Sequence, residues 1–485
     1  MNPFLAVAPH LGLIAMTMSA FHLLPIAVSL YYRDGAVNAF SASMAVNIAA
    51  GGVIWLVTRR YRGALGPRDG MLMVVLAWAG GAAFATLPLL LLIPGLSFTD
   101  AYFEAVSGLT TTGATVLSNL DKLPPSLNLW RCLLVWLGGM GLIVLAVAVL
   151  PLLGVGGRQI MRAETPGPMK DTQLTPRITE TAKALWVVYA LISLACAVSY
   201  LAAGMSVFDA VVHMFSTMGL GGFSNHDASF GYWNSPTIEA ASIAFMLLAG
   251  INFGTHFLAF RAHSFRPYRR DPEVGLFIAI IVASCVGIAI YLLLVGTYPG
   301  FLTALRYASF NVVSIATTTG YANTDYNMWP IFAPMWMLFL CSFVSCSGST
   351  GGGVKMIRAQ LLAVQVYREF IKLLHPHAVT PLKVRDQVVE NKVIFAVLAF
   401  MFVYISLIVV MTLVLLATGV DAITAFTAVI ACINNTGPGL NQVGPATTYA
   451  VLGDFQTWVC TFAMLVGRLE LFTLLIVFTP AFWRK

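Results

Sequence analysis

The chain has 485 residues, of which 59% are hydrophobic and 10% are charged, with a net charge of +7. So few charged residues exclude a soluble globular protein and indicate a chain that crosses a membrane many times. Basic residues gather in the cytoplasmic loops of membrane proteins, so the positive charge reflects topology and does not indicate binding to nucleic acid. The seven cysteines form no CxxC pair, which argues against a disulfide framework or a zinc site.

Two apolar runs, at about 4–30 and 38–58, open the chain. Each is long enough to cross a membrane as a helix, which takes roughly 20 residues. A basic cluster follows at 59–62 and marks the cytoplasmic side. Residues 1–69 are therefore predicted to form two N-terminal transmembrane helices with the N-terminus inside.

One pattern then occurs four times: a long apolar run, a shorter amphipathic run, a glycine-bearing turn and a second long apolar run. The short runs are too short to span a membrane and predict re-entrant helices that enter it and stop. They lie at 99–109, 206–218, 301–316 and 421–433. The predicted fold is an all-α polytopic membrane protein with four pore repeats around a central pore. The repeats are placed at 70–157, 158–262, 263–365 and 366–485.

The four turns align on a glycine. They read Thr110-Thr111-Thr112-Gly113, Gly219-Leu220-Gly221-Gly222, Thr317-Thr318-Thr319-Gly320 and Asn434-Asn435-Thr436-Gly437, and the glycines recur at intervals of 109, 98 and 117 residues. One such turn alone is more often a simple helix end, but four copies with the same flanks indicate turns arranged around one axis. Rings of backbone carbonyls can replace the hydration shell of an alkali cation, and the C-terminal ends of the short helices also favour a cation. These residues are predicted to form a cation filter.

Acidic residues stand near the predicted outer mouth. Asp100 and Asp209 each lie 13 residues before their filter glycine. With Glu104 and Asp421 they are placed to enrich cations there, although capping of the short helices explains the two aspartates equally well.

The second long run of the third repeat extends from Pro330 to about residue 365. As an unbroken helix it would be ~50 Å long at 1.5 Å per residue, against a bilayer core of roughly 30 Å. The run is interrupted by Gly348, Ser349, Thr350, Gly351, Gly352 and Gly353. Because each glycine costs about 1 kcal/mol relative to alanine in a helix, we predict a break there, with the unwound backbone facing the ion pathway.

Arg468 is predicted to lie at the depth of this break. It follows Gly437 by 31 residues, just as Gly351 follows Gly320 by 31 residues. Its guanidinium either donates to carbonyls of the loop or pairs with Glu470 or another acid, and the sequence leaves both open.

Several of these segments carry a family resemblance. SGLTTTGAT at 107–115, ATTTGYAN at 316–323, NNTGPG at 434–439, GSTGGGVK at 348–355 and GRLE at 467–470 resemble the Trk/Ktr/HKT superfamily of potassium-translocating subunits. The resemblance covers the chain from residue 70 onward, and the two additional N-terminal helices resemble the bacterial Trk type. It implies that the filter glycines bind potassium, since members with serine in place of Gly113 tend towards sodium. It also implies that the segment ending at Lys355 is an intramembrane gate beneath the filter.

The second turn departs from the family pattern. Gly219 and Leu220 stand where the first and third turns have threonines, so no hydroxyl contacts to the ion are expected from it.

The function expected is potassium uptake across the bacterial inner membrane through a gated, channel-like pore. Potassium is the substrate, and no cofactor is expected in this chain. The resemblance further implies a homodimer in the lipid membrane and a cytosolic ring of nucleotide-binding regulatory subunits. The basic segments 158–177, 261–270 and 355–392 are candidate docking surfaces for that ring, although such loops are more often determinants of topology.

Two other function classes compete with a pore. A secondary transporter coupling potassium to protons or sodium also fits broken helices and repeats, but it needs a titratable group within the membrane, for which Glu104 and Glu470 are the candidates. A membrane-embedded enzyme is disfavoured, because the sequence has no HExxH or GxSxG motif and no paired intramembrane aspartates.

Overall fold

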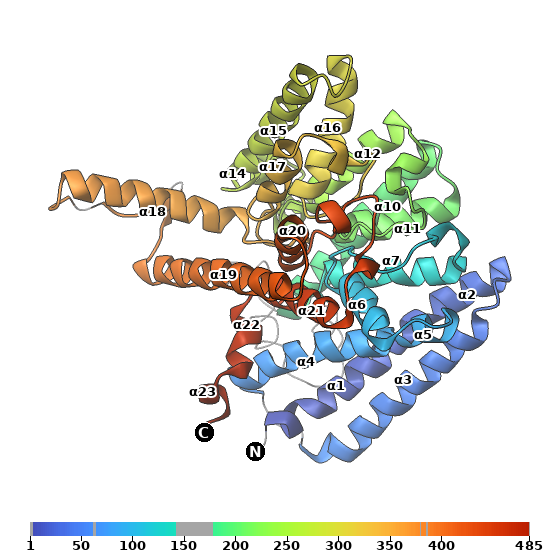
Figure 1. Ribbon diagram of the computed structural model, residues 1–485. Coiled ribbons are helices and arrows are strands. Elements are labelled where there is room, and N and C mark those ends of the chain that lie inside the picture. Colours follow the sequence, from blue (N-terminus) through green and yellow to red (C-terminus); the bar gives the residue numbers. More distant parts are fainter. Residues whose placement is uncertain (1–2, 62–64, 142–177, 379, 385–386, 485) are drawn as a thin grey trace.

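A computed structural model describes residues 3–61, 65–141, 178–378, 380–384 and 387–484 (Figure 1). Within these residues the chain is helical apart from loops and one hairpin of two short strands, β1 (Lys383–Val384) and β2 (Gln387–Val388). Six of the described helices are long and apolar enough to cross a membrane, and two bent helix pairs raise the number to eight. The predicted all-α polytopic fold is confirmed.

The N-terminal part is a helical hairpin. Its first arm is α1 (Pro3–Ser19), the 3-10 turn η1 (Ala20–His22) and α2 (Leu23–Tyr32), and its second arm is α3 (Val37–Thr58) followed by η2 (Arg59–Tyr61). The arms touch at Gly12 and Gly51, where a Cβ on either glycine would lie within 2.7 Å of the other's carbonyl oxygen. Such close approach of backbones is how small residues allow helices to pack in membranes.

Four short helices each end at one of the four glycine-bearing turns. They are α6 (Phe98–Leu109), α11 (Val207–Gly219), α16 (Phe301–Ala316) and α20 (Ala422–Ile433). Three of them begin at a capping side chain, Ser97, Ser206 or Asp421, whose oxygen accepts a backbone N–H of the first turn. Each helix is too short to span a bilayer, as the sequence predicts.

Longer helices precede and follow each short one. Those that precede are α4 (Pro67–Ala85) with α5 (Leu87–Leu92), α10 (Ile178–Ala202), α15 (Val274–Leu294) and α19 (Asn391–Ala417). Those that follow are α7 (Pro125–Gly139), α12 (Pro236–Ala249), α17 (Phe332–Cys341) and α21 (Asp454–Arg468). Short 3-10 turns lie in the loops between: η3 (Leu120–Lys122), η5 (Ser229–Tyr232), η6 (Tyr326–Met328), η7 (Asn441–Val443) and η8 (Tyr449–Val451).

The third repeat breaks where the sequence predicts a break, and over a longer stretch. Residues 342–355 are non-helical between α17 and α18 (Met356–Leu374). Figure 1 shows α18 and α19 extending side by side from the body of the molecule. A small apolar cluster lies between them, including Ile357, Leu361 and Ile394.

Two further bends were not predicted, because the mostly apolar runs at 237–260 and 449–480 each predict one long segment. The axes of α12 and α13 (Phe253–Ala262) differ by 94°, and those of α21 and Phe472–Phe478 by 111°. At the first bend the Asn252 side chain caps α13 by accepting from the Gly254 amide at 2.8 Å. At the second, Glu470 and Leu471 both have positive φ, which ends the helix.

The remaining helices lie at the ends of these segments. They are α14 (Arg266–Arg270), α22 (Phe472–Leu475), η9 (Ile476–Phe478) and α23 (Pro480–Trp483). Part of the apolar run at 130–155 and the whole basic segment 158–177 lie outside the described residues.

A candidate ion pathway

The four turns share one backbone conformation. Their second residues have positive φ, namely Thr111 at 57°, Leu220 at 55°, Thr318 at 63° and Asn435 at 54°. The glycines at the fourth position are also positive, with Gly113 at 78°, Gly222 at 43°, Gly320 at 90° and Gly437 at 94°. Four repetitions of a conformation that costs non-glycine residues roughly 1–2 kcal/mol each indicate a shared constraint.

The third residue of every turn is fixed to its own helix. Its amide donates to a carbonyl of the last helical turn, as in Thr112 to Ser107 at 2.8 Å and Gly221 to Ser216 at 3.1 Å. The other two turns repeat this bond, with Thr319 donating to Ser314 and Thr436 donating to Ala431.

The glycines close the turns into a ring. A Cβ on Gly113 would lie 2.6 Å from the Gly221 carbonyl oxygen, and one on Gly437 would lie 2.7 Å from that of Thr112. In the same way a Cβ on Gly222 would collide with the Thr319 carbonyl, and one on Gly320 with the Thr436 carbonyl. Each glycine thus packs against the third residue of the next turn, and the fourth returns to the first. The turns therefore surround one axis in chain order.

Side chains support the turns in different ways. In the first and third turns the hydroxyls of the first and third threonines share a hydrogen bond of 2.8 Å, between Thr110 and Thr112 and between Thr317 and Thr319. The fourth turn is bonded to the first, because the Asn435 amide donates to the Thr112 hydroxyl at 3.0 Å. The second turn has glycine at its first and third positions.

The glycine-rich loop lies against the first and second positions of the turns. The Gly352 amide donates to the Thr318 hydroxyl at 2.9 Å, and a Cβ on Gly352 would collide with the Asn434 carbonyl. A Cβ on Gly351 would lie 3.0 Å from the Thr317 carbonyl oxygen. Further along, the Thr350 hydroxyl donates to the Met218 carbonyl at 3.0 Å. The loop therefore contacts three of the four repeats at the opposite end of the turns from the ring glycines.

Two basic side chains hold this loop. The buried Lys355 ammonium donates to the Gly351 carbonyl. Arg468 donates to the Thr350 carbonyl at 2.9 Å and to the Gly139 carbonyl, at the end of α7, at 3.2 Å. The sequence leaves open whether Arg468 contacts a carbonyl of the loop or pairs with an acid, and the structure shows the contact with the loop carbonyl. The Glu470 carboxylate forms an ion pair of 2.6 Å with Arg358.

Glu273, which the sequence does not single out, fixes the backbone on both sides of the loop. One of its carboxylate oxygens accepts the Ser347 amide at 2.9 Å and the Ile357 amide at 3.1 Å. No local signal could have found it, because both partners lie more than 70 residues further along the chain.

The acidic residues around the four turns have structural partners. Asp421 caps α20, and Asp100 and Asp209 accept hydrogen bonds of 2.8 Å from the capping serines of α6 and α11. Glu104 differs from the expectation of an outer-mouth position, since it is 1% exposed and pairs with Arg131 at 2.7 Å.

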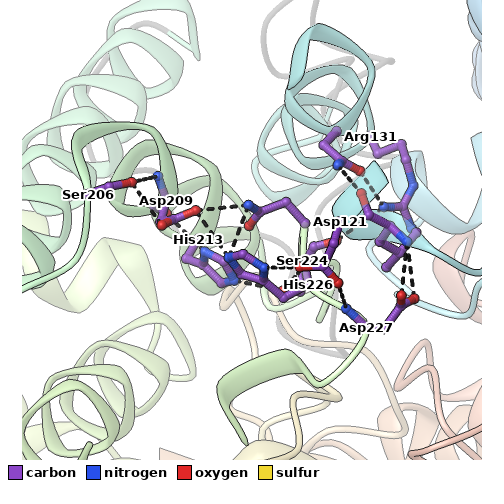
Figure 2. A network of polar contacts seen from close by, with 11 residues as sticks. Asp121, Arg131, Ser206, Asp209, His213, Ser224, His226 and Asp227 are labelled. Atoms are coloured by element: carbon purple, nitrogen blue, oxygen red, sulfur yellow. Dashed lines mark hydrogen bonds and ion pairs between the residues drawn. The ribbon is translucent and has the colours of Figure 1, made fainter. Parts of the chain in front are cut away.

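A polar network joins the loops that follow the first and second turns (Figure 2). His226 contacts Asp121 at 2.5 Å and Asp209 at 3.3 Å. The Asp227 amide in turn donates to Asp121 at 3.2 Å, and Asp227 accepts the Leu120 amide at 3.1 Å. Burial alone would lower the pKa of His226, but the hydrogen bonds and charges of the two carboxylates outweigh it and raise the pKa.

The chain is similar to known cation transport proteins over nearly its whole length. The TrkH family, described as a cation transport protein, matches residues 36–485. The Trk system potassium uptake protein TrkH of Salmonella typhimurium is 45% identical over 99% of this chain and its own full length, and that of Vibrio parahaemolyticus is 46% identical with the same coverage. The crystal structure of the potassium transporter TrkH from Vibrio parahaemolyticus superposes with a TM-score of 0.89 at 43% identity, covering 99% of this chain and 100% of that one.

Family and helices agree on the class of protein. The apolar helices and these bacterial relatives make the chain a multi-pass protein of the inner membrane. The family is one of transporters and not of enzymes. With a family match over nearly its whole length and relatives of this similarity, the chain belongs to the TrkH family of cation transport proteins.

Proposed function

We propose that the chain takes up potassium through a gated pore whose selectivity filter is the ring of four turns. The observation that carries this proposal is the closed ring of glycines, each packed on a carbonyl of the next turn. A ring of this kind holds backbone carbonyls around one axis, where they can replace the hydration shell of a cation. The relatives are potassium uptake proteins by name, which supports potassium as the ion.

Each filter residue contributes backbone oxygen. The first and third turns add threonine hydroxyls, while the second turn, Gly219 to Gly222, contributes carbonyls alone. The short helices direct their C-terminal, partially negative ends towards the ring, which stabilises a cation there. Residues 70–157, 158–262, 263–365 and 366–485 each supply one quarter of the ring in this proposal.

The gate is the loop 348–353. It is packed against Thr317, Thr318 and Asn434, so an ion leaving the filter towards the cytoplasm meets this segment. Lys355 and Arg468 hold the loop through its carbonyls. Conduction requires that these contacts open and that the loop moves aside.

A pore is favoured over coupled transport by the partners of two carboxylates. Glu104 is paired with Arg131 and Glu470 with Arg358, so each carboxylate already has a charged partner within the protein. A proton-coupled cycle would need one of them to change protonation. The current measured across a bilayer should reverse at the potassium equilibrium potential, and a pH gradient should not change this reversal potential. A reversal potential that follows pH would favour coupling.

The proposed assembly is a homodimer in the membrane with a cytosolic, nucleotide-binding regulatory partner. Segments 261–270 and 355–392 would dock that partner, and they contain the basic helix α14 and the extended α18. Segment 158–177 is proposed as a third docking surface.

The filter is tested by Gly113→Ser. The serine side chain would meet the Gly221 carbonyl, so we expect the potassium-to-sodium flux ratio of reconstituted vesicles to fall by roughly tenfold, as small displacements of positioned groups can do. Gly95→Ser is the matched control. Gly95 has φ of 79°, close to the 78° of Gly113, but a Cβ there meets nothing within 4 Å. An unchanged ratio in folded Gly113→Ser protein would contradict the filter assignment.

A further inference from the structure

The second turn lacks the side-chain supports that hold the other three. The first and third turns have a threonine pair, and the fourth is tied to the first through Asn435. In the second turn, Gly219 and Gly221 have no side chain to form such a bond. Since all four turns adopt the same strained backbone, the second must be held by groups outside it.

Arg131 of α7 holds the residues that follow this turn. Its guanidinium donates to the Ser224 carbonyl at 3.1 Å and lies over the Phe223 ring at 4.4 Å. The neighbouring Cys132 thiol donates to the Phe223 carbonyl at 3.7 Å. Figure 2 shows Arg131 reaching the segment of Ser224 from the helix of the first repeat. The backbone just after Gly222 is therefore fixed on two sides by one helix.

Glu104 in turn fixes Arg131. The Arg131 Nε donates to Glu104 at 2.8 Å, and a terminal nitrogen lies 2.7 Å from the same oxygen. The carboxylate also accepts the Val116 amide at 3.1 Å and the Thr115 hydroxyl at 2.9 Å, both just after the first turn. The ion pair thus joins the backbone after the first filter turn to the backbone after the second.

The contacts of Arg131 require the planar, five-donor guanidinium of arginine. Its remaining donors go to Asn128 at 3.2 Å and to the Thr115 hydroxyl at 3.3 Å. Arg131 is 1% exposed, so these partners must satisfy the planar fork in place of water. A lysine retains the charge but cannot place donors on Glu104 and Ser224 while stacking on Phe223.

We propose that Arg131, oriented by Glu104, is a positioning residue of the filter that sets the second turn and thereby the preference for potassium. This inference rests on the proposed filter function. Arg131 acts through the Phe223–Ser224 backbone and does not itself contact the ion. The adjacent Glu104 neutralises its charge, so the pathway gains a rigid support without a net positive charge beside it.

Two variants test the role. Arg131→Lys keeps the charge and loses the fork, and Arg131→Met combined with Glu104→Gln removes both charges, so that no single charge is left buried. The control is Arg306→Met with Glu239→Gln, an ion pair of 2.6 Å. The hydrogen bonds of Arg306 go to Glu239 and Asn234, neither of which belongs to a turn. Potassium, rubidium and sodium fluxes are measured in vesicles per amount of monodisperse protein.

We expect both Arg131 variants to lower the potassium-to-sodium ratio by roughly tenfold while the control keeps it, because displaced positioning groups have effects of this size. If the double variant does not fold, Arg131→Lys decides alone. The positioning role is overturned if the potassium-to-sodium ratio of Arg131→Lys stays at the value of the unchanged protein. It is also overturned if the ratio falls equally in the control. Gly113→Ser separates this failure from that of the filter itself: a changed ratio there with unchanged Arg131 variants rejects only the role of Arg131.

Discussion

The ring glycines are under two constraints, of which the sequence shows one. Their alignment in four turns predicts a position that favours positive φ, and the structure adds that a carbonyl of the next turn fills the place of a side chain. The second constraint could not be predicted, because it joins turns that are about a hundred residues or more apart in the chain. The same holds for Arg131 and Ser347, the partners of Glu104 and Glu273, which come from distant segments of the chain.

A substitution at Gly320 separates these two constraints. Gly320→Ala should nearly abolish potassium flux, because a methyl group would collide with the Thr436 carbonyl and the backbone has φ of 90°. Gly419→Ala carries the same backbone strain at φ of 89°, with nothing within 4 Å of the methyl, and should retain flux. The measurement is potassium uptake by vesicles containing equal amounts of folded protein. Equal losses of flux in both variants would show that backbone strain causes the loss and that contact with the next turn does not.

At the scale of elements, the short helices and their turns were predictable and the bends beneath them were not. A short amphipathic run before a glycine turn is visible locally, and so is the cluster of glycines at 348–353. The bends after α12 and α21 depend on few local signals, such as the Asn252 cap, within runs that are mostly apolar. The structure therefore shows interrupted helices after the turns of the second, third and fourth repeats, where the sequence indicated one.

The loop contacts predict the effect of Arg468→Ala. Without the guanidinium, the Thr350 and Gly139 carbonyls lose a charged donor, a bond of the kind typically worth about 1.5–3 kcal/mol. The closed loop should become less stable, and potassium flux in vesicles without a cytosolic partner should rise several-fold. Deletion of residues 351–353 should act in the same direction.

The control for this prediction is Arg68→Ala, because Arg68 donates to the Arg484 carbonyl near the C-terminus, away from the loop. Flux that stays the same or decreases in Arg468→Ala, with unchanged folding, would rule out a gating role.

At the scale of the whole molecule, polar seams between neighbouring repeats hold the outer loops together. The seam between the first and second repeats is the network of His226, Asp121 and Asp209 (Figure 2). The ring of Tyr232 is stacked on His226 at 3.6 Å, and the ring of His213 lies 6.4 Å away. The pKa of Asp121 is lowered, since hydrogen bonds from His226 and the Asp227 amide outweigh its burial.

This seam predicts a pH dependence of stability. Because the pKa of His226 is raised above 6.5 in the folded protein, its contribution is complete below pH 6.5 and is lost as the pH rises through the folded value. The carboxylates act oppositely: their pKa values are lowered, so their contribution disappears only in acid. Melting temperature should therefore fall on going from neutral to alkaline pH, and His226→Gln should reduce this dependence.

His375→Gln, at an exposed histidine after α18, is the control for the melting experiment. It should leave the pH profile unchanged. A profile that His226→Gln does not flatten would assign the dependence to other groups.

The loop at 348–353 comes from a single repeat, although the ring above it is built from four. In a pore of four identical chains, each subunit contributes a copy of the gate, and opening can be cooperative among them. Here one segment would obstruct the whole cross-section, so one local displacement would suffice and opening within a pore would follow simple two-state statistics. Any steep dependence on a regulator must then arise from coupling between pores or within the regulator, and single-channel records should show one conductance level for each pore.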